Sequence, residues 1–220
     1  MKRPKFQNGK YYHICNRGVD KREVFMCDED YLRFLISLRY FNDVNPTGGL
    51  YNYLQSFKLE TFARSKDLPK VPDNEPLVDI LCYCLNINHF HLLLKQKKED
   101  GVSNFMQKLS NSYTQYFNKK HKRSGVLFQG KFRAFEVKSE GKLWETSFYI
   151  NGNAEIHKID KCDKWPWSSC SDYLNIREGD LCSKNEVLKH FKNISEYKEL
   201  LFDYIREKKA WKEERKEFEK

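Results

Sequence analysis

Three features are missing from this sequence. No window approaches the roughly 20 consecutive apolar residues that a membrane-spanning helix needs, which predicts a soluble protein with no membrane partner. The N-terminus has no basic stretch followed by an apolar core of the secretory type. The seven cysteines are odd in number and form no even disulfide framework, so we expect a protein of the reducing cytoplasm.

The chain of 220 residues is instead rich in positive charge and aromatic rings. Lys and Arg number 40 against 31 Asp and Glu, a formal net charge of +9. Such an excess attracts polyanions, which makes nucleic acid the leading partner class, with a generic basic surface as the alternative. Apolar residues make up 40% and aromatic residues 15%, enough to build the core of one principal globular domain.

The order of apolar patterns predicts an α+β fold. Strand, helix, strand, strand, helix, strand and helix follow one another, which matches a ferredoxin-like antiparallel sheet with helices on one face and a C-terminal helical extension. The predicted elements are strand 10–18, a helix from Asp28, strands 77–85 and 89–95, helix 101–121 with Ser103 as N-cap, strand character over 126–138, and a helix from 140 to at least Ile150 with Gly152 as a weak point.

Composition suggests two parts. Residues 1–160 are predicted to form the sheet-containing domain, with a surface insertion at about 45–76, where turn-forming residues are concentrated. Residues 161–220 are expected to add an aromatic, turn-rich segment and a charged helical appendage.

The stretch "NINHFHLLLK" carries two histidines in a predicted strand. Side chains two residues apart in a strand share a face, so His89 and His91 lie together, either as core residues or as a metal clamp. A divalent ion needs further ligands. In the later helix Tyr149 and Asn153 are four residues apart, which puts a hydroxyl and an amide oxygen on one helical face.

Several stretches together resemble the single-tyrosine transposases of the HUH nuclease superfamily, in particular the branch of REP-associated tyrosine transposases. Each pattern is weak alone, and their order is specific. They are "YYHICNRGVDKREVF", "DEDYLRFL", "CYCLNINHFHLLLK", "FMQKLSNSYTQYFNKKHKRSGVLFQGKFRAF", "FYINGN" and "WPWSSCSDY".

The resemblance implies a DNA transposase that cleaves and rejoins single-stranded DNA through a 5′-phosphotyrosine, in transposition or repeat-element processing. Tyr149 would be the nucleophile, and His89, His91 and Asn153 would bind a divalent metal ion, Mg or Mn. The expected partner is single-stranded DNA with a hairpin, bound by a monomer or a homodimer. Many members have proline where this chain has Ile87 and Ala154, and Gly152 is a further departure.

Residues 119–133 interleave cationic and aromatic side chains. Cations follow phosphates while aromatic faces stack on unpaired bases, and the alternative is a solvated turn with two core phenylalanines. The expected DNA-binding residues are Lys119, Lys120, Lys122, Arg123, Phe128, Lys131, Phe132 and Arg133.

Other assignments compete with this one. Cys82 and Cys84 could join the two histidines in a structural zinc site if a turn at residues 86–88 brings them to one face. His157 could replace Asn153 as a ligand, and His13 is expected to be structural. Two further tyrosines, Tyr113 and Tyr116, fall on an apolar helical stripe and are expected in the core.

A second function is a DNA- or RNA-binding protein that keeps the fold without cleaving its ligand.

Overall fold

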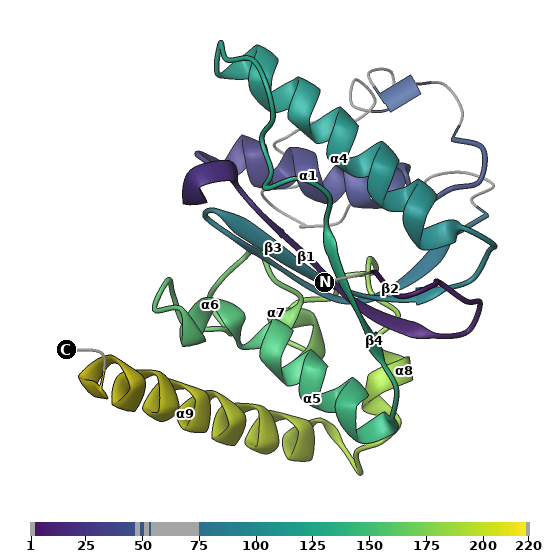
Figure 1. Cartoon of the computed structure of the whole chain (residues 1–220). Helices are drawn as coiled ribbons and strands as arrows, with labels where there is room; N and C mark the ends of the chain where they lie inside the picture. The colour runs from purple at the N-terminus through teal and green to yellow at the C-terminus, as the bar shows by residue number, and fades with distance from the viewer. Residues whose placement is uncertain (1–2, 47–48, 51–52, 54–74, 219–220) are drawn as a thin grey trace.

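The computed structural model describes residues 3–46, 49–50, 53 and 75–218 (Figure 1). Most of the insertion predicted at about 45–76 lies outside these residues. The strands are β1 Tyr11–Arg17, β2 Val78–Asn86, β3 His89–Gln96 and β4 Arg133–Val137. The helices are the 3-10 turn η1 Val19–Lys21, α1 Asp28–Tyr40, α4 Gly101–Lys120, α5 Glu140–Asn151, α6 Asn153–Ile156, α7 Cys170–Tyr173, α8 Asn185–Leu188 and α9 Ile194–Phe218.

The four strands form one antiparallel sheet in the order β2-β3-β1-β4. β2 and β3 form a hairpin in which Asn86 lies opposite His89 and Cys84 opposite His91. β1 then pairs with β3, so that Cys15 lies opposite His91. This order is that of the predicted ferredoxin-like fold, and the α+β class is confirmed.

Helices cover both faces of the sheet. Figure 1 shows α1 and α4 on one side and α5, α6 and α9 on the other. Phe90, Leu92 and Leu94 of β3 pack with α1 and α4, while Leu81 and Leu93 belong to a second apolar cluster with α5 and α9. The expectation of helices on one face therefore holds for α1 and α4 and is wrong for the later helices, because both faces of β2 and β3 are apolar and both need cover.

Two predicted details also change. The helix after β3 begins at Gly101 as predicted, but its N-cap is Asp100, in a left-handed conformation (φ 53°), and Ser103 lies inside the first turn. A Cβ on Gly101 would lie 2.4 Å from the Leu77 carbonyl oxygen, so the close approach of that backbone requires glycine. Strand character predicted over 126–138 narrows to β4, because the preceding residues form turns around Gly125 and Gly130.

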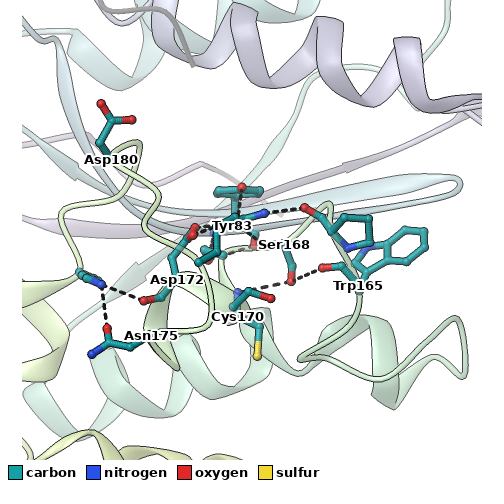
Figure 2. Close-up of polar contacts among 12 residues, drawn as sticks. Tyr83, Trp165, Ser168, Cys170, Asp172, Asn175 and Asp180 are labelled. Carbon is teal, nitrogen blue, oxygen red and sulfur yellow. Dashed lines mark hydrogen bonds and ion pairs between the residues drawn. The ribbon is translucent and has the colours of Figure 1, made fainter. Parts of the chain in front are cut away.

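The free edge of β2 is covered by the segment 165–183. Leu85 N donates to Trp167 O over 2.9 Å, Ser169 N to Tyr83 O over 3.0 Å, and the Trp165 indole nitrogen to Leu85 O over 2.9 Å. Figure 2 shows Ser168 beside Tyr83 of this strand, with Trp165 further along the covering segment. Strand edges expose unpaired backbone groups that invite aggregation, and this segment satisfies them.

An ion pair stabilises the covering segment. The Arg177 guanidinium donates to both carboxylate oxygens of Asp172 over 2.5 and 2.6 Å, and one of its nitrogens also reaches the Tyr83 hydroxyl over 3.1 Å. Bidentate pairs of this kind fix geometry as well as charge.

The C-terminal helix α9 is packed onto α5. Tyr197, Leu201 and Ile205 are at most 2% exposed in the cluster beneath the sheet. A Cβ on Gly152 would lie 2.6 Å from Ile205 Cγ1, so α9 approaches the chain between α5 and α6 where glycine leaves room. Among the described residues, none of the helices combines the length and apolarity needed to cross a membrane.

Candidate active site

The face of the sheet toward α5 carries a row of ligand-type side chains. His89 and His91 share it as predicted, with ring centroids 5.1 Å apart. The pairing of β1 with β3 adds Cys15 opposite His91 and Arg17 opposite His89. These residues border a cleft of about 270 Å³, lined by Cys15, Asn16, Arg17, His89, His91, Gln129, Arg133, Tyr149 and His157.

Helix α5 places Tyr149 over this row. Its ring centroid lies 5.4 Å from that of His91 and 5.8 Å from that of His13. The chain stays helical through Gly152 (φ −83°, ψ −4°), with Gly152 N bonded to Phe148 O and His157 N to Asn153 O. Tyr149 and Asn153 therefore keep the shared helical face predicted from their spacing.

Asn153 reaches the histidines through a second asparagine. The Asn86 side-chain amide donates to Asn153 Oδ1 over 2.5 Å and contacts His89 Nε2 over 2.9 Å. Asn153 is fully buried, and its own Nδ2 has no hydrogen-bond partner among the described residues. The four residues predicted as the site thus meet in space, although they come from separate parts of the chain.

Neighbours orient both imidazoles. His89 Nδ1 lies 2.7 Å from Asn88 Oδ1, which can only accept, so Nδ1 carries the proton and Nε2 the lone pair. His91 Nδ1 lies 2.9 Å from His13 Nε2. Burial lowers the pKa of His89 to about 4, with His157 and Arg17 adding to the shift, and burial lowers the pKa of His91 well below its ordinary value. Both rings are neutral at physiological pH and can act as ligands.

The hydroxyl of Tyr149 and the thiol of Cys15 are both protonated at physiological pH when no ion or DNA is bound. Burial raises the pKa of the Tyr149 hydroxyl, and the nearby Asn153 amide and the charge of Arg17 oppose that shift. Burial likewise raises the pKa of the Cys15 thiol, opposed by the charge of Arg133.

The predicted DNA-binding residues divide into three groups. Phe128 and Phe132 are 5% and 8% exposed and lie in the core cluster, so their expected stacking on bases is wrong and the alternative of core phenylalanines holds. Lys120 is held by Glu29 and Asp30, and Arg123 by Asn118 and the Val126 carbonyl. The third group has exposed side chains and consists of Lys119, Lys122, Lys131 and Arg133. Of these, Arg133 lines the cleft.

The structure also locates the residues of the competing assignments. Tyr113 is fully buried, with its hydroxyl donating to Val24 O, as expected for a core residue, and half-buried Tyr116 donates to Asp30. His157 lines the cleft, its ring centroid 5.2 Å from that of His89. His13, which was expected to be structural, contacts His91 through its ring nitrogen.

The zinc alternative on Cys82 and Cys84 gains no support. The hairpin does bring Cys84 opposite His91, but its thiol donates to Asn86 Oδ1 over 3.4 Å. Among the described residues, the His, Cys, Asp and Glu side chains close enough to share an ion are His13, Cys15 and His91.

Asn86, Cys15 and Arg17 were not identified from the sequence. The alternation of "HICNR" does put His13, Cys15 and Arg17 on one strand face, which was a usable signal. Which face met the histidines depended on strand pairing, which the sequence does not reveal.

Comparison with known proteins supports the resemblance. Residues 55–153, which contain all four predicted site residues, match the family model described as "Transposase IS200 like". The predicted resemblance to single-tyrosine transposases is confirmed. No curated protein sequence matches this transposase-like chain.

A solved structure of a REP-associated tyrosine transposase bound to a REP hairpin shares the fold, with a TM-score of 0.51. Sequence identity is 12%, and the match covers 80% of this chain and 84% of the other.

Proposed function

We propose that this chain cleaves and rejoins single-stranded DNA through a covalent bond between Tyr149 and a 5′ phosphate, in transposition or repeat-element processing. The observation that carries the proposal is the convergence of Tyr149 with His89, His91 and Asn153 beside one cleft. The match to IS200-like transposases over the same residues supports it.

The residues present fit a divalent metal ion. His89 Nε2 and Asn153 Oδ1 both contact one amide group, that of Asn86, and two acceptor atoms that converge on the positive end of a dipole can also converge on a cation. Outer contacts fix the ring of a metal-bound histidine, as Asn88 does for His89 and His13 for His91. When bound by His89, His91 and Asn153, Mg²⁺ or Mn²⁺ supplies charge withdrawal from the scissile phosphate.

The chain's own residues perform the remaining steps. The Tyr149 oxygen attacks phosphorus in line, loses its proton as the new bond forms, and displaces the 3′ oxygen, which leaves as a hydroxyl. The reverse attack by a 3′ hydroxyl rejoins the strand and needs no nucleotide cofactor, because the phosphotyrosine conserves the bond energy.

Two arginines beside the cleft suit an anionic ligand. Arg17 Nε is buried and has no hydrogen-bond partner among the described residues, and Arg133 lines the same cleft. Guanidinium groups bind phosphate oxygens with two parallel hydrogen bonds, so both residues are placed to hold the DNA backbone near Tyr149. Exposed Lys119, Lys122 and Lys131 extend the positive surface. The DNA partner is single-stranded and carries a hairpin.

The test is formation of a covalent adduct. The chain is incubated with a library of hairpin-bearing single-stranded DNA and Mn²⁺, and the products are separated under denaturing conditions. We expect a protein–DNA band that disappears in Tyr149→Phe. The matched control is Tyr204→Phe on α9, another half-buried tyrosine, which should keep the band.

DNA binding without an adduct in the unmodified chain would favour the second function, a nucleic-acid-binding protein that keeps the fold without cleavage. An adduct that persists in Tyr149→Phe would contradict the assignment of the nucleophile.

A further inference from the structure

Three donor atoms of the kinds that zinc prefers meet at the border of the cleft. His13 and Cys15 lie on β1 and His91 on β3, and their ligand atoms all lie within 4.8 Å of one another. Cys15 and His91 are direct partners in the strand pairing, and His13 is two residues from Cys15 on the same face. The sheet backbone therefore fixes all three positions.

The two imidazoles already face each other. His13 Nε2 and His91 Nδ1 are 2.9 Å apart, a distance at which one of them carries a shared proton. A tetrahedral Zn²⁺ with bonds of about 2.0 to 2.1 Å to nitrogen and 2.3 Å to sulfur holds two nitrogens about 3.3 Å apart. Small rotations of the two rings are therefore enough to admit an ion between them.

We propose that His13, Cys15 and His91 form a second metal site, which takes a thiophilic ion such as Zn²⁺ and excludes His91 from the metal site of the proposed cleavage reaction. A thiolate with two imidazoles is a donor set for zinc, whereas Mg²⁺ and Mn²⁺ prefer oxygen ligands. Cys15 and His13 are half-buried and Cys15 lines the cleft, so an ion can reach the site and water can fill the fourth position.

The proton balance is simple. Zn²⁺ binding releases the Cys15 thiol proton to solvent, and the proton shared by the two imidazoles moves to the other nitrogen of its own ring. Two neutral imidazoles and one thiolate leave a net charge of +1 on the complex. Nothing is oxidised or reduced.

Exclusion follows from the tautomers of His91. A neutral ring that binds zinc through Nδ1 carries its proton on Nε2, which then has no lone pair for a second ion. When Nε2 is the ligand, Nδ1 carries the proton and donates it to His13 at the observed 2.9 Å. The exclusion rests on the proposed cleavage function. The existence of a metal site at His13, Cys15 and His91 does not.

The site itself is tested with Co²⁺ alone on the full chain, following the thiolate-to-cobalt charge-transfer absorption. We expect one equivalent to give the band and Zn²⁺ to remove it. Cys15→Ser should abolish the band, and His13→Gln should weaken binding at least about tenfold, the lower end of what even outer-shell changes cost. Cys27→Ser, at an exposed cysteine, and His89→Ala are matched controls that should keep the band.

A band that survives in Cys15→Ser, or no Co²⁺ binding by the unmodified chain, would overturn the site. Circular dichroism of each variant establishes that it is folded, and His13→Gln serves if Cys15→Ser does not fold.

Exclusion is tested by magnetic resonance of Mn²⁺. We expect Zn²⁺ to displace bound Mn²⁺ from the unmodified chain, and to require at least about tenfold more Zn²⁺ in folded Cys15→Ser or His13→Gln. Equal displacement in all chains, or binding of both ions together, would overturn the exclusion. If the chain binds no Mn²⁺ while the Co²⁺ band forms, the proposed cleavage site fails and the second metal site stands.

Discussion

The two faces of strand β3 contain different chemistry. Toward α1 and α4, Phe90, Leu92 and Leu94 are fully buried in an apolar cluster. Toward α5, His89 and His91 are 8% and 7% exposed and border the cleft. A strand has a period of two, so adjacent residues can serve separate purposes. Substitutions on the histidine face should therefore change chemistry with little loss of stability, and substitutions on the apolar face should do the reverse.

The largest effect is expected from His91→Ala. Removing one imidazole should abolish adduct formation in the presence of Mn²⁺, because it removes a ligand of the proposed metal site and the contact with His13. Hairpin DNA binding, measured by a gel shift, should be largely retained. Equal loss of binding and adduct would indicate a packing role and remove the distinction between the faces.

Phe90→Ala tests the other face. Truncating a buried phenylalanine leaves a cavity and typically costs about 3 to 5 kcal/mol. We expect a loss of that size in urea unfolding, because Phe90 is fully buried and packs on Phe34 with ring centroids 5.0 Å apart. Under conditions where the variant is folded, Tyr149 should still form the adduct. Its absence from a folded variant would show that the faces are coupled.

Gly152→Ala tests the helix that carries Tyr149. A methyl group there would lie 2.6 Å from Ile205 Cγ1 and 2.9 Å from Phe148 O, and overpacking of this kind costs about 1 to 3 kcal/mol. Gly141→Ala in the same helix is the control, because its Cβ would meet nothing closer than 3.9 Å. We expect the double variant Gly152→Ala with Ile205→Ala to lose less stability than the sum of the losses of the two single variants. Additive losses would rule out the clash as the cause.

Asn88→Ala is expected to have the smallest effect. It removes the acceptor that holds His89 Nδ1 and should weaken Mn²⁺ binding about tenfold, as outer-shell substitutions do. Unfolding in urea should change little, because Asn88 is half-buried in the turn between β2 and β3. Unchanged Mn²⁺ affinity would show that ring orientation does not depend on this contact.

Local patterns predicted much of the fold. The alternation in β3 correctly put His89 and His91 on one face, and helical spacing correctly put Tyr149 and Asn153 together. Both depend on residues within a few positions of each other, where periodicity determines geometry.

Contacts between distant segments were not predictable in the same way. Gly152 looked like a defect in a helix, and its reason is Ile205, 53 positions later in the chain. His13 meets His91 because β1 pairs with β3 in one register. Phe128 and Phe132 looked like stacking platforms because charge surrounds them, yet tertiary packing buries both. Strand register and helix docking are properties of the whole fold, so single-sequence patterns miss them.

The segment that covers the edge of β2 bears on where this protein can be shortened. A chain ending near residue 160 would keep the sheet and Tyr149, but it would lose the partners of Tyr83 and Leu85 and the helix that buries the outer side of α5. We expect such a fragment to aggregate on expression, while the full chain elutes as a discrete species in gel filtration. The smallest unit that folds by itself should extend at least to Ile205, so the residues that follow 160 are a structural part of the same folded unit as the sheet.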